Sequence, residues 1–385
     1  MSYLRTMLAS AVFLLVLVFP AWGQGTPTPN NANNDMIVFS RATNGGGSEI
    51  VMMRPDGTAT TQLTNTPLSE SSPAWSPDGT KIAFAGAPEG TFEVDIHAMN
   101  TDGSNRQQLT TSPATEYVPS WSPDGSKIAF ERDLPIRENE ILPKIFVMNA
   151  DGSDQVQIRS DRTSSESSPA WSPDGSKIAF VGVGVIAGSE EIYTMNVDGS
   201  DIKQLTESAN MTKEAPDWSP DGSKIVFGAY DRNTGGKYDI FMMNADGSEV
   251  RNLTNNPNSN DIHPVWSPDG REIAFVRDPD LDTFGDSDIW RMRADGSSPT
   301  KITSNTVDDS DPDWQVLTSR IRTQGNEGQR VTPEPTSRRS GDQRVIPETT
   351  SRRSLPGTGG LALLAPAIGL LLISGAVARL VVRRR

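Results

Sequence analysis

The stretch Trp75-Ser76-Pro77-Asp78-Gly79 opens a pattern that recurs along this 385-residue chain. The words Lys-Ile-Ala-Phe or close variants follow it each time. The tryptophans of the complete copies are Trp75, Trp121, Trp171, Trp218 and Trp266, and Trp314 stands in the same frame without the turn. The steps between them are 46, 50, 47, 48 and 48 residues. A period of this size, built from strands and turns, is typical of propellers and related arrays.

One repeat reads as two hairpins. In Ser-Pro-Asp-Gly, proline presets φ, Ser and Asp bond the local backbone, and glycine accepts the left-handed conformation. Such a turn joins two antiparallel strands through a bulged hairpin. A second hairpin follows, with an acid and Ile at its start and Asp-Gly at its turn, as in Asp95-Ile96 and Asp102-Gly103. A short strand such as Gln108-Leu109-Thr110 completes a predicted four-stranded antiparallel meander.

The chain begins and ends inside a repeat. Ile37-Val38-Phe39 matches the second strand of a unit, whereas Trp314 belongs to a first strand. Pairing these two halves would close a ring of six blades and leave no exposed end, which is one way that all-β proteins protect strand edges. We therefore expect an all-β, six-bladed β-propeller over residues 36–318, closed by its N- and C-terminal strands.

These words resemble the blades of the TolB-type β-propeller family. The resemblance covers about residues 36–318 and is carried by Pro-x-Trp-Ser-Pro-Asp-Gly, Lys-Ile-Ala-Phe, Met-Asn-x-Asp-Gly-Ser and Leu-Thr. TolB carries a separate α/β domain before its propeller. Only residues 26–35 precede the first expected strand here, so we expect that domain, and any function that depends on it, to be absent.

Composition limits the function. No cysteine is present, which excludes disulfides, thiolate metal sites and a cysteine nucleophile. Residues 26–318 carry 45 acidic and 22 basic residues. A body this acidic repels phosphate backbones, so nucleic acid is not an expected partner, whereas cations and basic protein surfaces are.

Both ends of the chain differ from the repeats. Residues 1–23 have Arg5, a short apolar run and Ala21-Trp22-Gly23, a pattern that indicates a secretory signal peptide rather than an uncleaved anchor. Residues 24–35 are rich in Pro, Asn and Thr and are expected to be a disordered spacer. Residues 319–354 are rich in Arg, Ser, Thr and Pro. They are expected to form an extended stalk, either a solubilising spacer or a segment that binds an acidic wall polymer.

The last segment, residues 355–385, resembles the sorting signal of sortase substrates in Gram-positive bacteria. Leu355, Pro356, Gly357, Thr358 and Gly359 precede an apolar run, residues 361–378, that is long enough to span a bilayer, and a basic tail follows. The resemblance implies cleavage after Thr358 and attachment to the cell wall. A plain C-terminal membrane anchor is the alternative.

The six tryptophans are expected in the core. Each has a proline two residues earlier, and proline, which lacks an N–H, belongs on a sheet edge such as the innermost strand of a blade. Strand alternation then directs the tryptophan against the neighbouring blade.

Acids recur ahead of these inner strands. Five of them lie five residues before their tryptophans, and in the fourth unit Lys213 takes that place, with Glu214 one step later; the five are Glu70, Glu116, Glu166, Asp261 and Asp309. Six-fold placement predicts a ring of carboxylates at one mouth of the channel, suited to a basic peptide or to a hard cation such as Ca²⁺. The alternative is that each acid caps a turn and stays solvated.

Other candidate sites are weaker. His263, three residues before Trp266, is a ligand-binding candidate at the channel mouth, whereas His97 is expected in a packed strand. Two histidines cannot form a three-histidine metal centre. The acidic loop from Asp278 to Asp288 lacks the Gly and Glu of a calcium loop and reads as a solvated loop. No nucleophile elbow or phosphate loop is present.

We therefore expect a non-enzymatic binding module displayed on the surface of a Gram-positive-type bacterium. The resemblance implies protein partners, and an envelope polymer is the second option. The alternatives are a glycan-cleaving propeller that uses acids at the same mouth and a structural spacer of the envelope. The longer loops of the second and fifth units, residues 131–144 and 276–288, are expected to influence specificity, because variable loops on a rigid scaffold commonly carry recognition.

Overall fold

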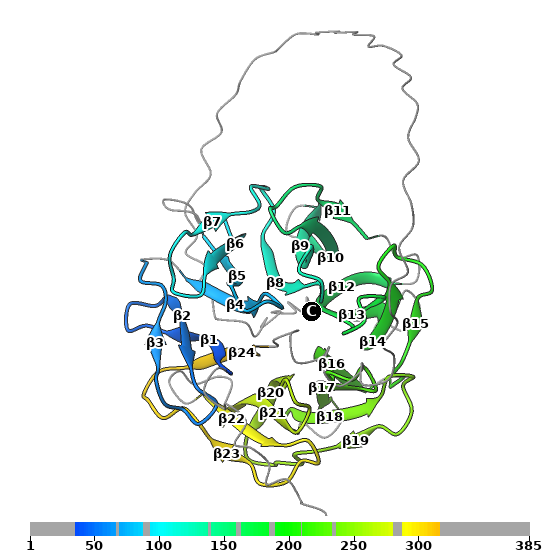
Figure 1. Ribbon diagram of the computed structural model, residues 1–385. Coiled ribbons are helices and arrows are strands. Elements are labelled where there is room, and N and C mark those ends of the chain that lie inside the picture. The colour runs from blue at the N-terminus through cyan, green and yellow to red at the C-terminus, as the bar shows by residue number, and fades with distance from the viewer. Residues whose placement is uncertain are drawn as a thin grey trace, which may run out of the picture. The chain divides into compact units, whose positions relative to one another are not determined.

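The computed structural model describes residues 35–66, 69–87, 93–137, 140–158, 163–184, 189–208, 210–232, 236–279 and 287–315. Within these residues, twenty-four strands form six four-stranded antiparallel sheets arranged radially as blades (Figure 1). The predicted six-bladed, all-β propeller is thus confirmed. The predicted signal peptide, spacer, stalk, sorting motif Leu355–Gly359 and helix 361–378 lie outside the described residues.

The first three blades are given from the inside outward. Blade 1 contains β24 (Asp309–Trp314), β1 (Ile37–Ala42), β2 (Ser48–Met53) and β3 (Thr61–Gln62). Blade 2 contains β4 (Glu70–Trp75), β5 (Lys81–Gly86), β6 (Asp95–Asn100) and β7 (Gln107–Gln108). Blade 3 contains β8 (Glu116–Trp121), β9 (Lys127–Arg137), β10 (Glu140–Asn149) and β11 (Val156–Gln157).

The other three blades repeat this order. Blade 4 contains β12 (Thr163–Trp171), β13 (Lys177–Gly184), β14 (Glu190–Asn196) and β15 (Lys203–Gln204). Blade 5 contains β16 (Met211–Trp218), β17 (Lys224–Asp231), β18 (Asp239–Asn244) and β19 (Arg251–Asn252). Blade 6 contains β20 (Asn260–Trp266), β21 (Glu272–Asp278), β22 (Asp288–Arg293) and β23 (Thr300–Lys301).

Ring closure occurs in blade 1, as the sequence predicted. Ile37 pairs with Trp314 and Arg41 with Asp309, so β1 and β24 from the two ends of the folded body form one antiparallel ladder. The backbone N–H of Gln315 also donates to the carbonyl of Met36 at 2.9 Å. The half-units at the two ends therefore cover each other's open edge.

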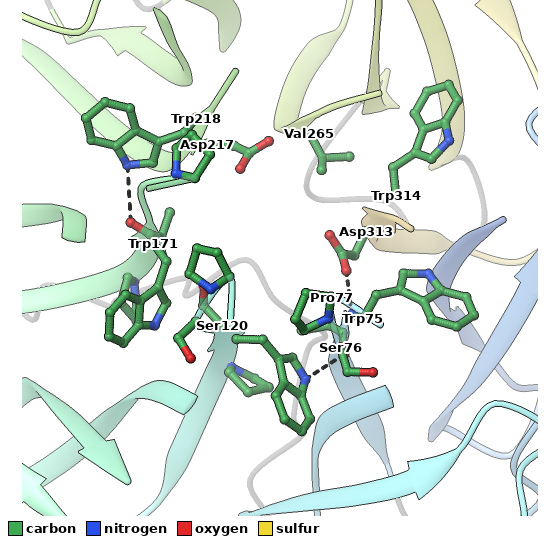
Figure 2. Close-up of a pocket in the computed structure, with 18 of the residues that line it drawn as sticks. Trp75, Ser76, Pro77, Ser120, Trp171, Asp217, Trp218, Val265, Asp313 and Trp314 are labelled. Atoms are coloured by element: carbon green, nitrogen blue, oxygen red, sulfur yellow. Dashed lines mark hydrogen bonds between the residues drawn. The ribbon is translucent and has the colours of Figure 1, made fainter. Parts of the chain in front are cut away.

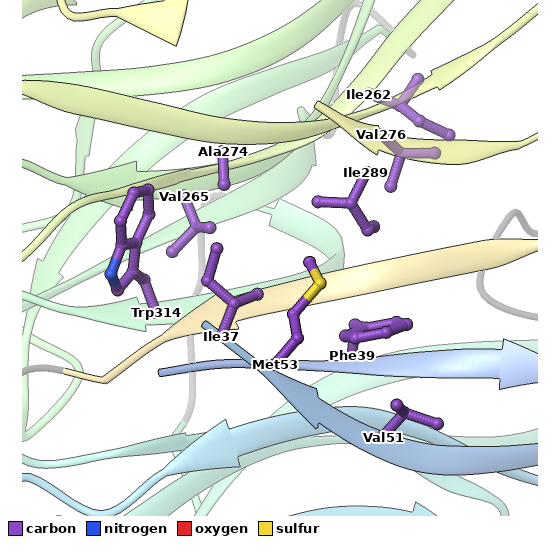
Figure 3. Packing of buried hydrophobic residues seen from close by; sticks show 10 residues of the cluster. All are labelled: Ile37, Phe39, Val51, Met53, Ile262, Val265, Ala274, Val276, Ile289 and Trp314. Atoms are coloured by element: carbon purple, nitrogen blue, oxygen red, sulfur yellow. The ribbon is translucent and has the colours of Figure 1, made fainter. Parts of the chain in front are cut away.

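The apolar core lies between blades, with one cluster at each of the six blade junctions. Figure 3 shows the junction of blades 6 and 1, where Ile37, Met53 and Trp314 pack against Ile289 and Val265. Trp75, Trp218, Trp266 and Trp314 are buried, and Trp121 and Trp171 are half-buried, which confirms the core role predicted for the tryptophans.

The repeated sequence motifs form the same hydrogen bonds in successive blades. In the first turn, Ser76 Oγ donates to Asp78 Oδ1 at 2.7 Å and accepts from the N–H of Lys81 at 2.9 Å. In the outer hairpin, Thr110 Oγ1 accepts from the N–H of Ile96 at 2.9 Å and donates to Asp95 at 3.2 Å. The threonine of the Leu-Thr motif therefore hydrogen-bonds to the acid and to the isoleucine of the third strand.

Each inner strand contains one residue with positive φ, three positions before its tryptophan. The six φ values lie between 44° and 52°, for Ser72, Val118, Ser168, Ala215, His263 and Asp311. Each lies at or beside a shift in strand register, which marks a β-bulge. None is glycine, so the conformation is imposed by the fold rather than by the local residue.

Among the described residues, no helix is long and apolar enough to cross a membrane.

Candidate functional site

A channel with a volume of about 1260 Å³ lies at the centre of the ring. It is lined by the ends of all six inner strands and by Ser-Pro-Asp-Gly turns (Figure 2). Two layers of side chains in its wall come from the positions one and three residues before each tryptophan. The first layer is Ala74, Ser120, Ala170, Asp217, Val265 and Asp313, and the second consists of the six bulge residues.

The acids five residues before the tryptophans lie elsewhere. They stand at the start of the inner strands, and of the residues put forward from the sequence only His263 is among the described residues that line this cavity. All five side chains are buried, with at most 1% of Glu166 exposed. The expected open ring of acidic side chains is therefore absent from this part of the chain.

Each of these acids is paired with a basic side chain. Glu116 contacts Arg132 at 2.6 Å, Glu166 contacts Lys144 at 3.0 Å, and Glu70 contacts Arg106. Asp261 contacts Arg277 at 2.7 Å and Asp309 contacts Arg41 at 2.6 Å. In blade 5 the polarity is reversed, because Lys213 pairs with Glu191 at 2.7 Å.

Local pairing removes the negative potential that the ring was expected to produce. Burial raises the pKa of Glu70, Glu116 and Asp261, although the neighbouring arginines oppose that shift. The arginines in turn lie over phenylalanine rings, as Arg41 does over Phe39 at 5.0 Å. Four of these five pairs lie within one blade, whereas Glu166 and Lys144 join blades 4 and 3. The role of the acids as ligand contacts stays a prediction.

The inner strands direct backbone N–H groups into the channel. In every blade the residue after the tryptophan donates its N–H to the second strand, as Ser76 does to Lys81 at 2.9 Å. Donors alternate along an antiparallel strand, so the N–H of the tryptophan itself points the other way, towards the axis. Two of these groups are seen to donate to aspartates: Trp75 to Asp313 at 2.6 Å and Trp266 to Asp217 at 2.8 Å.

Asp217 and Asp313 are the residues that the sequence analysis missed. Figure 2 shows both carboxylates turned towards the open centre of the channel. Burial in the channel wall raises the pKa of Asp217 to about 7, against hydrogen bonds from the N–H groups of Trp266 and Trp218. Burial likewise raises the pKa of Asp313 to about 7, helped by the charge of Asp217. The charge of Asp217 thus reaches the carboxylate of Asp313.

A histidine ion pair lies beside them. His263 Nδ1 of blade 6 contacts Asp311 Oδ1 of blade 1 at 3.0 Å. Burial alone would lower the pKa of His263, but the hydrogen bond and charge of Asp311 raise it to about 9, and Glu214 adds to this. Glu214 is half-buried, and burial raises its pKa. His263 is therefore a charged link between blades at neutral pH.

His97 is buried in blade 2, as predicted, and stacks on Phe84 with 5.5 Å between ring centres. Its Nε2 lies 3.1 Å from the carbonyl of Gly86, and its Nδ1 accepts from Arg106 at 3.5 Å. Burial, with the charge of Arg106, lowers the pKa of His97 to about 4. The ring is neutral at physiological pH, and its nitrogens are occupied inside the blade.

The described residues contain no candidate metal site. Among the described residues, no group of three or more His, Asp or Glu side chains is arranged to hold a metal ion. Of the acidic loop between Asp278 and Asp288, only the ends are described: Asp278 accepts from Ser287 at 2.7 Å, and Asp288 pairs with Lys301. Both ends are therefore engaged within blade 6.

A sequence signal for the missed aspartates exists. When the repeats are aligned on their tryptophans, the preceding position reads Ala, Ser, Ala, Asp, Val, Asp. The two aspartates are exceptions at a position otherwise occupied by small or apolar residues. The structure, and not the sequence, shows that this position lines the channel.

Comparison with known proteins places this fold. The family model for the TolB beta propeller domain matches residues 28–158 and 136–354. The chain belongs to the TolB β-propeller family. A search of curated proteins found no match for this TolB-family chain.

Solved structures agree on the fold of this family member. TolB from Acinetobacter baumannii superposes with a TM-score of 0.61 at 22% identity, covering 73% of this chain and 66% of that protein. A putative TolB from Agrobacterium tumefaciens gives 0.55 at 23% identity, covering 70% and 88%. Kuenenia stuttgartiensis hydrazine synthase gives 0.61 at 19% identity, covering 73% and 46%. At these identities the likeness shows the fold alone.

Proposed function

We propose that this TolB-family chain is a non-enzymatic binding module that takes an extended segment of a protein partner into its central channel. The observation that carries this is the channel wall itself. Six inner strands end there with backbone N–H groups directed at the axis, next to two carboxylates that face the open centre. Strand edges of this kind recognise extended peptides through main-chain hydrogen bonds.

The channel has dimensions suited to such a ligand. A cavity of about 1260 Å³ exceeds the usual range of small-molecule pockets, roughly 300–1,000 Å³. Its wall is built on the rigid ends of β-strands and on turns fixed by internal hydrogen bonds. A pre-formed wall lowers the entropic cost of binding a flexible segment.

We further infer that the chain is exported and displayed at the outer surface of a Gram-positive-type bacterium. The signal-peptide pattern of residues 1–23, the stalk of 319–354 and the sorting motif at Leu355–Gly359 support this. Sortase is then a processing partner, and the apolar run 361–378 is a membrane anchor before processing. Fractionation of cells producing the wild type and Thr358→Ala tests it. We expect the wild type in the wall fraction and the variant in the membrane fraction.

The acid pair in the channel also favours a second candidate, a propeller that cleaves glycans. Glycosidases use two carboxylates, but they need one protonated and one ionised at the same time. Here burial raises the pKa of Asp217 and of Asp313 to the same value, about 7, and both accept backbone N–H groups. Two equivalent carboxylates fit binding better than acid–base division of labour. Polysaccharide turnover that disappears in Asp217→Asn would support the enzyme instead.

The absence of cysteine gives a direct test of channel binding. Twelve-residue peptides are selected from a random display library on the full-length protein. Single-cysteine variants Ser120→Cys, in the channel wall, and Gln107→Cys, on exposed β7, are then labelled with a maleimide. Bound peptide should slow labelling at position 120 at least tenfold and leave position 107 unchanged. Equal rates with and without peptide, or the recovery of no binders, would contradict the proposal.

A further inference from the structure

The channel wall is divided into two halves of different chemistry. Blades 5, 6 and 1 supply every charged side chain of its two layers: Asp217, His263, Asp311 and Asp313. Blades 2, 3 and 4 supply only neutral ones to these layers: Ser72, Ala74, Val118, Ser120, Ser168 and Ala170. Their turns add charged residues at the rim, which are Asp78, Lys81, Asp124, Lys127 and Asp174. We call these the charged half and the neutral half.

The charged half contains two carboxylates without a counter-ion. His263 is committed to Asp311, and the buried acids at the start of the inner strands have their own basic partners. In the described part of the chain, no basic side chain forms an ion pair with Asp217 or Asp313. A desolvated carboxylate without a partner is costly, and the protein has not supplied the compensating charge.

The same two aspartates determine which backbone donors remain open. Asp217 accepts from the N–H of Trp266 and also interacts with that of Trp218. Asp313 does the same for Trp75 and Trp314. In blades 2, 3 and 4 the corresponding positions are Ala74, Ser120 and Ala170, which offer no carboxylate. The N–H groups of Trp121 and Trp171 therefore face the channel without an acid acceptor, across from the charged half.

We propose that the channel ligand is an extended peptide whose primary ammonium group, from lysine or a free N-terminus, lies between Asp217 and Asp313, while a carbonyl of the same peptide accepts from Trp121 or Trp171. This inference rests on the proposed function and names the chemistry of its ligand. The peptide completes both halves at once, since it supplies the missing cation on one side and the missing acceptor on the other.

An ammonium group fits this arrangement better than the other cations. Its three donors diverge from one point and can reach two carboxylates on different blades. A guanidinium prefers one carboxylate approached in parallel by two N–H groups. Calcium takes six to eight oxygen ligands, more than two carboxylates supply. Two carboxylates that both face the open centre of the channel therefore favour a compact monovalent donor.

Asparagine variants separate the two roles of the aspartates. An Asn side chain keeps an oxygen that accepts the N–H of Trp266 or Trp75, but it loses the charge. Asp217→Asn and Asp313→Asn should therefore unfold no earlier than the wild type, since they also remove a buried charge, and should lose affinity for the cation. Glu249→Gln, on an exposed outer turn, is the matched control for net charge.

The test measures affinities at pH 8 for the peptides selected on the full-length protein. We expect each Asp→Asn variant to weaken binding at least tenfold, and Glu249→Gln less than twofold. Replacing the contacting lysine of the peptide with norleucine should weaken binding to the wild type at least tenfold, and replacing it with arginine should do so by at least threefold. The norleucine comparison uses only the wild type, so it decides even if a variant fails to fold. Acetylation of the N-terminus distinguishes the two sources of ammonium.

Three results would overturn the inference. Peptides that protect Ser120→Cys from labelling yet bind equally well with norleucine would leave the channel as the binding site and remove the ammonium. Arginine peptides that bind as tightly as lysine peptides would show a general cation site. Calcium that binds alone, displaces the peptides, and loses affinity in the Asn variants would show a metal site. Recovery of no peptide would remove the proposed function together with this inference.

Discussion

The charged and neutral halves of the channel wall are built from the same repeat, yet they differ in what joins the blades. In blades 5, 6 and 1, ionisable side chains cross from one blade to the next, through Asp217, His263 and Asp313. In the neutral half, Trp121 Nε1 donates to the carbonyl of Ala74 at 3.2 Å, and the charged link between blades 3 and 4, from Lys144 to Glu166, lies outside the channel wall. Apolar packing between blades is common to both halves. Under the proposed function, the charges of the channel wall serve binding.

The largest expected effect concerns the histidine of the charged half. Asp311 raises the pKa of His263 to about 9 in the folded protein, above its usual 6.5. The folded protein thus holds this proton more tightly than the unfolded chain does. The stabilisation is complete below pH 6.5 and is lost as the pH rises through 9. It should amount to about 3 kcal/mol in the free energy of unfolding.

Denaturant unfolding between pH 6 and pH 10 measures this term. His263→Gln should remove most of the loss of stability above pH 7 that the wild type shows. An identical pH profile in wild type and variant would show that the ion pair with Asp311 does not stabilise the fold.

His97, which is buried inside blade 2, should behave in the opposite way. Burial lowers the pKa of His97 to about 4, so the unfolded chain binds the proton more readily. Stability should fall as the pH drops from 6.5 towards 4, by about 2 kcal/mol at pH 5. His97→Phe imitates Phe146, which pairs in the same place in blade 3. It should flatten this acid limb in denaturant titrations. A variant that loses stability below pH 6 as steeply as the wild type would contradict the neutral state of His97.

The aspartates themselves can be tested as links between blades. Asp313→Ala removes the acceptor of the Trp75 N–H and should cost about 1–2 kcal/mol of unfolding free energy, because a buried donor loses its partner. Asp313→Asn keeps an acceptor oxygen and should cost less than about 0.5 kcal/mol. Equal destabilisation by both changes would mean that the charge, rather than the hydrogen bond, holds blades 1 and 2 together.

The smallest effect comes from giving the neutral half what it lacks. Ala74 holds the place in blade 2 that Asp217 and Asp313 hold in blades 5 and 1. Ala74→Asn should supply an acceptor for the N–H of Trp121 and raise stability by up to about 1 kcal/mol. It should also weaken peptide binding, since the ligand carbonyl loses its donor. A stabilised variant with unchanged affinity would exclude Trp121 as a ligand contact.

The sequence predicted the ring well because the ring depends on repetition. Six copies of one turn and one core word determine the period, and the two half-units at Ile37 and Trp314 determine how the circle closes. Glycine and proline have few conformational choices, so their positions translate directly into turns and edges. The fold was therefore readable from local rules.

The site was not readable in the same way. Glu70 and its equivalents are acids in a polar stretch, and nothing near them in sequence reveals that Arg106, 36 residues later, buries and neutralises this one. The bulge at Ser72, Val118 and the equivalent positions falls on residues with no preference for positive φ. The sequence did not show that the residue before each tryptophan lines the channel, so the aspartates before Trp218 and Trp314 were missed. Ion pairs between residues far apart in the sequence, and backbone conformations imposed by the fold, cannot be predicted from local sequence patterns.

The most direct test of the charged half is the pH dependence of peptide affinity. Asp217 and Asp313 have pKa values of about 7, and the groups beside them are His263, Asp311 and the rim residues Lys81, Lys127, Asp78 and Asp124. A lysine peptide stays cationic throughout, since its pKa is about 10.4. Its Kd for the full-length protein should fall at least tenfold from pH 6 to pH 8.5, while Asp217→Asn/Asp313→Asn shows no such change. Equal Kd values at the two pH values for the wild type would contradict the account.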